Sequence, residues 1–122
     1  MNILSINARG VASDLKQSWI KKLVTSNKVY LLRIQETFIK EAEFRLLKSL
    51  WGNRTFDFKL LEANGRSRGI LSVWDASVFS KSGSSVGIGY LAVWGHWVGF
   101  RDIFGFINVY APQATQDKKG CG

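Results

Sequence analysis

The chain has 122 residues, of which 46% are hydrophobic, and 17 Lys and Arg against 9 Asp and Glu give it a formal net charge of +8. This length and apolar content favour one modest folded domain and argue against wholesale disorder. One Cys and one His are too few for a disulfide framework or a structural zinc site, so any bound metal would have to be a hard cation with oxygen ligands.

The excess of positive charge is typical of proteins that bind a polyanion, most commonly nucleic acid. An ordinary basic domain has the same composition, so charge alone does not decide between the two. No apolar run approaches the length of a membrane span, and residues 1–5 lack the basic start and apolar core of a signal peptide. We therefore expect an intracellular protein of the nucleus or cytoplasm with no membrane partner.

The first part of the chain predicts a strand, a helix and a second strand. Residues 2–6 predict a short buried strand that ends at the turn Asn7-Ala8-Arg9-Gly10. Residues 13–26 predict a helix with Ser13 as its N-cap, and the apolar run 29–34 predicts the next strand. The helix supplies the crossover that a parallel strand pair requires. The residues expected on its apolar face are Leu15, Trp19, Ile20 and Leu23.

The rest of the chain predicts one more helix and mostly antiparallel strands. The expected helix covers 40–50, with Phe44, Leu47 and Leu50 on one side. Strands are expected over 55–61 and 70–74, and 86–100 with 102–110 is expected to form a hairpin pair after a polar, flexible patch over 81–85. The fold class is therefore α/β, with a mixed, largely antiparallel sheet and two flanking helices. Residues 114–122 lack periodicity and are expected to form a disordered tail.

Polar side chains follow three of the predicted strands. Asn7 follows the first strand, Glu36 follows the second, and Asn108 and Tyr110 lie at the end of the last. Ligands bind at the carboxyl ends of strands in open α/β sheets. A carboxylate beside a carboxamide suits Mg²⁺, which can polarise a phosphate and activate water. The structural alternatives are that Glu36 favours the dipole of a following helix and that Asn7 is a turn former.

Three further features have a functional and a structural interpretation. The loop Gly65-Arg66-Ser67-Arg68-Gly69 carries donors that can hold backbone phosphates, or it is an ordinary hairpin loop. His96 lies in an expected strand without an acidic residue close by in the sequence, so a packed or surface residue is the simpler interpretation. We expect the tryptophans at positions 51, 74, 94 and 97 to fill the core or the sheet rather than to stack on bases.

Four blocks of sequence occur in the order found in one known family. They are Asn2–Gly10, Leu32–Thr37, Gly65–Ser67 with Gly69–Asp75, and Asn108–Gln113. The series resembles the endonuclease domain of plant non-LTR (LINE-type) retrotransposon polyproteins. That domain belongs to the endonuclease/exonuclease/phosphatase family, which includes apurinic endonucleases and DNase I. The likeness assigns residues 1–113 to a truncated domain of this family.

The resemblance implies a DNase I-like fold, which is a four-layered α/β sandwich with two packed sheets. It also implies cleavage of phosphodiester bonds with Mg²⁺, or Mn²⁺ in its place, and DNA, or RNA, as the partner. By the resemblance, Asn7 and Glu36 bind the metal and Tyr110 contacts the scissile phosphate, so that these three form the catalytic set. The residues expected to bind phosphate or nucleic acid are Arg9, Arg66, Arg68 and Asn108.

The chain also departs from the family pattern. The Asp-x-Asn and Ser-Asp-His blocks that serve the phosphate and the attacking water are absent, and the likeness ends after Gln113. Arg68 stands where Gly is usual, and Phe38 stands where Lys is frequent. The resemblance therefore implies about half of such a domain, with weak or absent metal binding and no effective catalysis.

A half-sandwich would expose an apolar sheet face and an open edge strand, so self-association is expected. Two other interpretations remain open at this point. The chain is a non-catalytic basic module that binds nucleic acid by charge, or it is an unselected pseudogene product.

Overall fold

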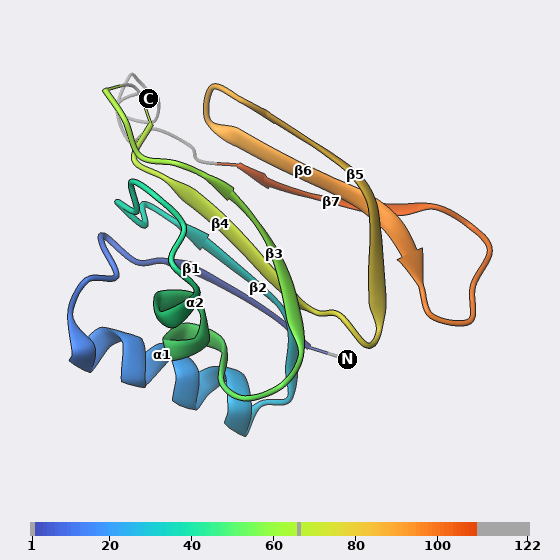
Figure 1. Cartoon of the computed structure of the whole chain (residues 1–122), viewed down its shortest axis with the longest axis horizontal. Helices are drawn as coiled ribbons and strands as arrows, with labels where there is room; N and C mark the ends of the chain where they lie inside the picture. Colours follow the sequence, from blue (N-terminus) through green and yellow to red (C-terminus); the bar gives the residue numbers. More distant parts are fainter. Residues whose placement is uncertain (1, 66, 110–122) are drawn as a thin grey trace, which may run out of the picture.

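The computed structural model describes residues 2–65 and 67–109, which form seven strands and two helices (Figure 1). In chain order the elements are β1 (Asn2–Asn7), α1 (Asp14–Ser26), β2 (Val29–Gln35), α2 (Phe44–Trp51), β3 (Phe56–Leu61), β4 (Ile70–Asp75), β5 (Phe79–Gly87), β6 (Tyr90–Trp97) and β7 (Phe104–Val109). Arg66, Tyr110 and the expected tail over 114–122 lie outside the described residues. No helix within the described ranges is long and apolar enough to cross a membrane.

The strands form two sheets that stack face to face, and both helices cover the outer face of one of them (Figure 1). Sheet A has the strand order β1-β2-β4-β3, and sheet B has the order β5-β6-β7. The β1–β2 pair is parallel, and the other pairings in the two sheets are antiparallel. The predicted α/β class, with largely antiparallel strands and two flanking helices, is confirmed.

Helix α1 begins at the predicted cap but buries a different stripe from the one expected. The Ser13 side chain accepts a hydrogen bond from the Lys16 backbone N–H at 3.0 Å. Ile20 and Val24 are buried one helical turn apart, whereas Leu15 is 82% exposed and Trp19 is 53% exposed. The prediction of Leu15 and Trp19 on the buried face was wrong, because the stripe that meets the core is narrower and rotated toward Val24.

Helix α2 begins at Phe44, four residues later than the expected start at 40. Leu47, Leu50 and Trp51 are buried, but Phe44 is 67% exposed and stacks on Phe56, with 5.4 Å between the ring centroids. The chain between β2 and α2 is therefore a long loop, and Glu36 at its start is not part of a helix. The helix-dipole interpretation of Glu36 is excluded.

The expected hairpin pairing is confirmed between β6 and β7, but the expectation of a flexible patch over 81–85 and of one strand over the whole of 86–100 was wrong. Residues Phe79–Gly87 form strand β5, which pairs with β6 over its whole length. Small residues suit this strand because the Trp94 ring of β6 lies across it, and a Cβ on Gly83 would stand 2.7 Å from that ring. The strand is thus specified by a partner side chain rather than by its own hydrophobicity.

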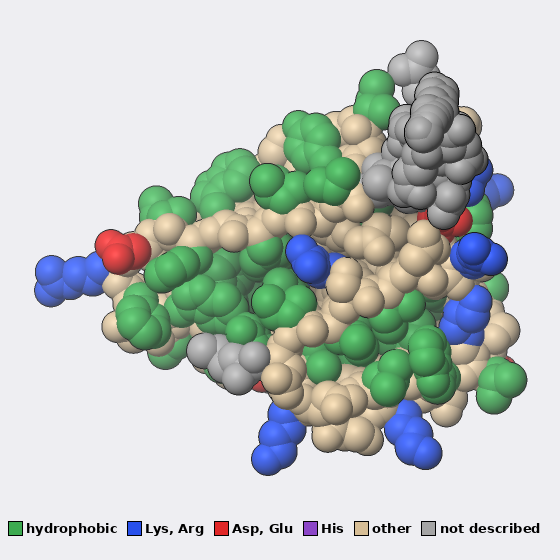
Figure 2. All heavy atoms as spheres, turned by 180° about the vertical axis from the view of Figure 1, so that it is seen from behind, with side chains coloured by type: hydrophobic (Ala, Val, Ile, Leu, Met, Phe, Trp, Pro, Cys, Tyr) green, Lys and Arg blue, Asp and Glu red, His purple; other side chains and the backbone are tan. Residues whose placement is uncertain are grey.

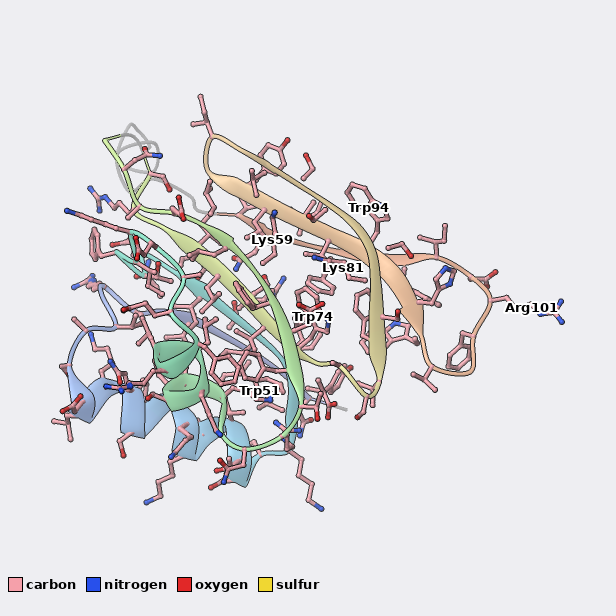
Figure 3. All side chains as sticks on the ribbon, viewed as in Figure 1. Trp51, Lys59, Trp74, Lys81, Trp94 and Arg101 are labelled. Atoms are coloured by element: carbon pink, nitrogen blue, oxygen red, sulfur yellow. The ribbon has the colours of Figure 1, made fainter. Side chains whose placement is uncertain are left out.

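Two apolar cores lie on the two faces of sheet A. Leu32 and Ile34 of β2 face the helices, whereas Leu31 faces sheet B, as the alternation of a strand requires. Trp51 lies in the first core and Trp74 in the second, both almost fully buried (Figure 3). The predicted core role is confirmed for these two tryptophans, whereas Trp94 is 39% exposed.

Asn108 is a buried polar residue that connects sheet B to sheet A. Its Nδ2 donates to the Leu71 carbonyl oxygen at 3.0 Å, and its Oδ1 accepts from Gln35 Nε2 at 2.5 Å. It is 1% exposed, so its hydrogen bonds are made out of contact with water. This bridge joins the end of β7 to the end of β2 and the start of β4, and it connects the two sheets at that edge.

Sheet B presents apolar side chains outside both cores. Ile107 and Val109 of β7 are 57% and 55% exposed, and Tyr90 of β6 is 38% exposed. Among the described strands β7 pairs only with β6, so its other edge is open. Figure 2 shows hydrophobic side chains gathered in broad patches on the side of the molecule opposite to Figure 1. Exposed apolar surface was expected, and self-association through it stays a prediction.

We predict that Asn108→Ala lowers the free energy of unfolding by about 2–3 kcal/mol, because the two hydrogen bonds of the buried carboxamide to Leu71 and Gln35 are lost. Urea denaturation of dilute protein measures this change. Val109→Ala is the matched control, because this neighbour on β7 is 55% exposed and should cost less than about 1 kcal/mol. Equal losses for the two variants would show that the bridge does not stabilise the sandwich.

Candidate metal and phosphate site

The parallel pairing of β1 and β2 brings Asn7 and Glu36 to one edge of sheet A. Asn7 lies opposite Gln35 in the register, so the residue after Gln35 emerges beside it. Asn7 Nδ2 donates a hydrogen bond to Glu36 Oε2 at 3.0 Å, across 29 residues of sequence. The Gly10 N–H donates to the Glu36 carbonyl oxygen at 2.7 Å. Two of the three residues predicted to form the catalytic set are therefore in direct contact.

The strand that precedes the third residue in the sequence also runs toward this edge. β1, β2 and β7 all run toward the left side of Figure 1. The end of β7 is anchored there by Asn108, whose partner Gln35 directly precedes Glu36. Tyr110 follows β7 in the sequence but lies outside the described residues. Its contact with a scissile phosphate stays a prediction.

The backbone at Glu36 adopts a conformation that residues other than glycine rarely take. Glu36 has φ +56° and Phe38 has φ +57°, both in the left-handed region. Each such residue costs on the order of 1–3 kcal/mol and persists only where its surroundings impose the conformation. Here the Thr37 N–H donates to the Gly69 carbonyl at 3.1 Å and the Phe38 N–H donates to the Arg68 carbonyl at 2.7 Å. The loop before β4 thus holds the turn that presents Glu36.

The Glu36 carboxylate has a polar partner on each oxygen although it is largely buried. Its side chain is 10% exposed. Oε2 accepts from Asn7, and Oε1 faces Arg68 Nη1 at 3.4 Å. Each carboxylate oxygen has two lone pairs, so both retain capacity for a further partner. The carboxylate is therefore fixed in position but can still accept a cation.

The donor set at this edge fits Mg²⁺ or Mn²⁺ at a minimal site. Among the described residues, no three His, Cys, Asp or Glu side chains gather where they could hold a metal. Mg²⁺ commonly uses one or two carboxylates and keeps several waters. Glu36 would supply one carboxylate to such an ion, and Asn7 would supply Oδ1, because its Nδ2 faces Glu36.

The predicted phosphate-binding residues fall into three groups. Arg9 is exposed in the turn after β1, two residues beyond Asn7, and Arg68 contacts Glu36. Asn108 is buried, and its carboxamide is engaged between the sheets, so in this structure it positions the edge rather than facing solvent. Arg66 lies outside the described residues, and binding of phosphate by any of the four residues stays a prediction. His96 lies within β6 of sheet B, opposite Ser80, whereas Glu36 follows β2 of sheet A.

Two contributors to the site were not singled out by sequence reasoning. Gln35 donates a hydrogen bond to Asn108. The sequence pointed to this residue only through strand alternation, which places its side chain on the opposite face of β2 from Ile34. Gly69 has φ +91°, and a Cβ there would collide with the Thr37 hydroxyl. The glycine that closes the basic loop was the visible signal for this close approach.

Comparison with protein-family models and with curated proteins finds no match. Among solved structures, the catalytic domain of Xenopus laevis APE2 is similar to this chain, with a TM-score of 0.64 and 15% sequence identity. The match covers 97% of this chain and 47% of that domain, so the chain spans about half the length of its neighbour. The neighbour has the DNase I-like fold of the endonuclease/exonuclease/phosphatase family, and the expected fold is confirmed.

We predict that Gly69→Ala destabilises the chain by about 2 kcal/mol or more, because an L side chain is strained at this φ and would push the turn that carries Glu36. Urea denaturation gives the total loss, and hydrogen exchange at the Thr37 and Phe38 amides shows whether the turn loosens.

Gly65→Ala is the control for Gly69→Ala, because nothing lies within 4 Å of a Cβ at that position in the same loop. If both alanine variants unfold at the same urea concentration, the close packing of Gly69 against the turn is not what holds Glu36.

Proposed function

We propose that this chain carries part of the site of a divalent-metal-dependent phosphodiester hydrolase that acts on DNA. The observation that carries the proposal is the Glu36 carboxylate, held by Asn7 at 3.0 Å at the carboxyl edge of two parallel strands. The DNase I-like fold supports it, because the solved structure with this fold is a catalytic domain, that of APE2.

Each residue at this edge has a distinct role in the proposed site. Glu36 and the Oδ1 of Asn7 hold Mg²⁺ or Mn²⁺, and the hydrogen bond between them fixes the carboxylate. When bound, the metal polarises a phosphate oxygen and lowers the pKa of a coordinated water. Arg9 and Arg68 hold backbone phosphates by charge, and Tyr110 contacts the scissile phosphate.

We propose further that the source of the domain is a plant LINE-type retrotransposon polyprotein. The support is the ordered series of blocks around Asn7, Glu36 and Tyr110, together with the DNase I-like fold. A complete domain of the family that these blocks resemble nicks target DNA and exposes a 3′-OH for reverse transcription.

We expect this chain by itself to bind metal weakly and to cleave DNA very slowly. Only one carboxylate stands at the site among the described residues, and loss of a general base or of a transition-state donor typically costs orders of magnitude in rate. The chain spans 47% of the neighbouring catalytic domain, so the remaining groups would come from outside this length.

A second candidate function follows from the charge. A net charge of +8 is sufficient for sequence-independent binding of nucleic acid through release of counterions. In that case the edge residues have no chemical role, and binding weakens steeply between about 50 and about 200 mM salt whatever occupies position 36.

We predict saturable Mn²⁺ binding that is lost in Glu36→Gln, because the amide removes the charged metal ligand and keeps the shape of the side chain. Electron paramagnetic resonance of free Mn²⁺ measures it, and nicking of supercoiled plasmid with Mg²⁺ measures any residual cleavage. Asp102→Asn is the matched control, because it changes the charge equally in the exposed β6–β7 loop, next to Arg101 (Figure 3).

The outcomes separate the two candidate functions. Mn²⁺ binding kept by Asp102→Asn but lost by Glu36→Gln, with DNA binding strengthened by Mn²⁺, supports the hydrolase-derived site. Equal Mn²⁺ binding in wild type and Glu36→Gln rules out a metal site at this edge. An affinity for DNA that is the same with and without Mn²⁺, and the same in wild type and Glu36→Gln, identifies the basic module.

A further inference from the structure

The feature that carries a further inference is the half-exposed ring of Phe38, two residues beyond Glu36 in the same turn. We infer that Phe38 and the cavity beside it bind an unpaired base of the nucleic acid whose phosphates lie at this edge. The inference rests on the proposed function and deepens it, because it names the part of the substrate that the site recognises.

The backbone that presents the Phe38 ring is held from both sides. Phe38 has φ +57°, a conformation that persists at a residue other than glycine only where its surroundings impose it. Its N–H donates to the Arg68 carbonyl at 2.7 Å, and the Ile39 N–H donates to the Thr37 hydroxyl at 3.2 Å. The Ile39 carbonyl accepts from the Ala63 N–H at 2.7 Å. The turn is therefore ordered before a ligand arrives, so that binding costs it little conformational entropy.

The ring is exposed although its neighbours in the turn are buried. Phe38 is 50% exposed, whereas Thr37 and Ile39 on either side of it are buried. A Cβ on Gly10 would stand 3.4 Å from Phe38 Cδ2, so the ring lies against the backbone of the turn after β1. The Gly10 N–H donates to the Glu36 carbonyl, and the ring therefore lies at the proposed site. An apolar ring left exposed beside a phosphate site is suited to stack on a base.

A cavity of about 390 Å³ opens beside the Phe38 ring. Pockets for small organic ligands have volumes of about 300–1,000 Å³, so this cavity has room for a nucleobase. Of the residues that line it, Val11 and Ile39 are buried and Leu46 is half-buried. The inner wall is therefore apolar, as a surface that packs on the face of a base requires.

The charges around the cavity favour a base over a phosphate. Two exposed carboxylates, those of Glu41 and Glu43, line it together with one cation, Lys40. The excess of negative charge repels a phosphate. Carboxylates accept hydrogen bonds from the amino groups of bases, as at N4 of cytosine. The cavity is thus suited to the base of a nucleotide, while its phosphate stays at the edge.

Only a base that has left the helical stack can enter such a cavity. A base inside a duplex is stacked on both faces and presents only its edges in the grooves. A base in a bulge or a single strand can be splayed out onto an aromatic side chain. The chain should therefore prefer nucleic acid that has an unpaired base next to the phosphates it holds.

The test compares binding of the full chain to two DNA duplexes that carry 2-aminopurine, one with this base paired and one with it unpaired in a bulge. Fluorescence anisotropy without divalent metal measures affinity, and quenching of 2-aminopurine measures stacking. We expect wild type to bind the bulged duplex about five- to twentyfold more tightly than the paired duplex, with quenching, because one base stacks on the ring. Phe38→Leu, which keeps an apolar side chain without an aromatic face, should reduce this preference to less than about twofold and abolish the quenching.

Phe100→Leu is the matched control, because this ring is also largely exposed but lies in the β6–β7 loop. It should keep the preference for the bulged duplex. Phe38→Tyr retains an aromatic face and should keep the preference too, which separates loss of stacking from loss of the fold. Ala12→Leu adds bulk at a residue that lines the cavity and should lower the preference with the Phe38 ring unchanged.

A preference that persists in Phe38→Leu would overturn the inference, as would an equal loss in Phe100→Leu. A preference that Ala12→Leu leaves intact would also overturn it, because the ring would then act without the cavity. Failure of the proposed function is seen separately, in a titration without DNA, as equal Mn²⁺ binding by wild type and Glu36→Gln. Mn²⁺ binding lost in Glu36→Gln, with equal affinity of wild type for the two duplexes, rejects the base site alone.

Discussion

The arrangement of this chain depends on the parallel pairing of its first two strands. A parallel pair ends at one edge, and the register that sets Asn7 opposite Gln35 brings Glu36 within hydrogen-bonding distance of Asn7. The crossover helix that makes the pairing possible is held by Ser13 at its start and by Ile20 and Val24 against the core. A one-residue change in this register would turn the side chains of one strand to the opposite face and break the contact between Asn7 and Glu36.

The same edge is stabilised from the second sheet. Gln35 points toward sheet B and binds Asn108, whereas Glu36 turns away from the strand in a left-handed conformation. The loop before β4 closes the arrangement through its hydrogen bonds to Thr37 and Phe38. Three segments distant in sequence thus fix one carboxylate, and a carboxylate held in this way is suited to bind a cation without further ordering.

Local signals predicted much of this arrangement, and contacts distant in sequence account for the rest. Asn7 and Glu36 could be singled out because each follows an apolar strand, and the Ser13 cap is a local pattern. Strand β5 could not be predicted from its Ser and Gly residues, because it pairs with β6, and at Gly83 the Trp94 ring of that strand leaves no room for a side chain. The contact of Arg68 with Glu36 spans 32 residues and follows from the fold of the loop, which no periodicity reveals.

The measurement that tests the central claim most directly is the paramagnetic broadening of nuclear magnetic resonance signals by sparing Mn²⁺ in ¹⁵N-labelled protein. If Asn7 and Glu36 together form the cation site, the side-chain amide of Asn7 and the backbone amides of Glu36 and Thr37 should broaden first. The same signals should stay sharp in Glu36→Gln. Broadening that begins elsewhere in the chain, or that is the same in wild type and Glu36→Gln, would contradict the account.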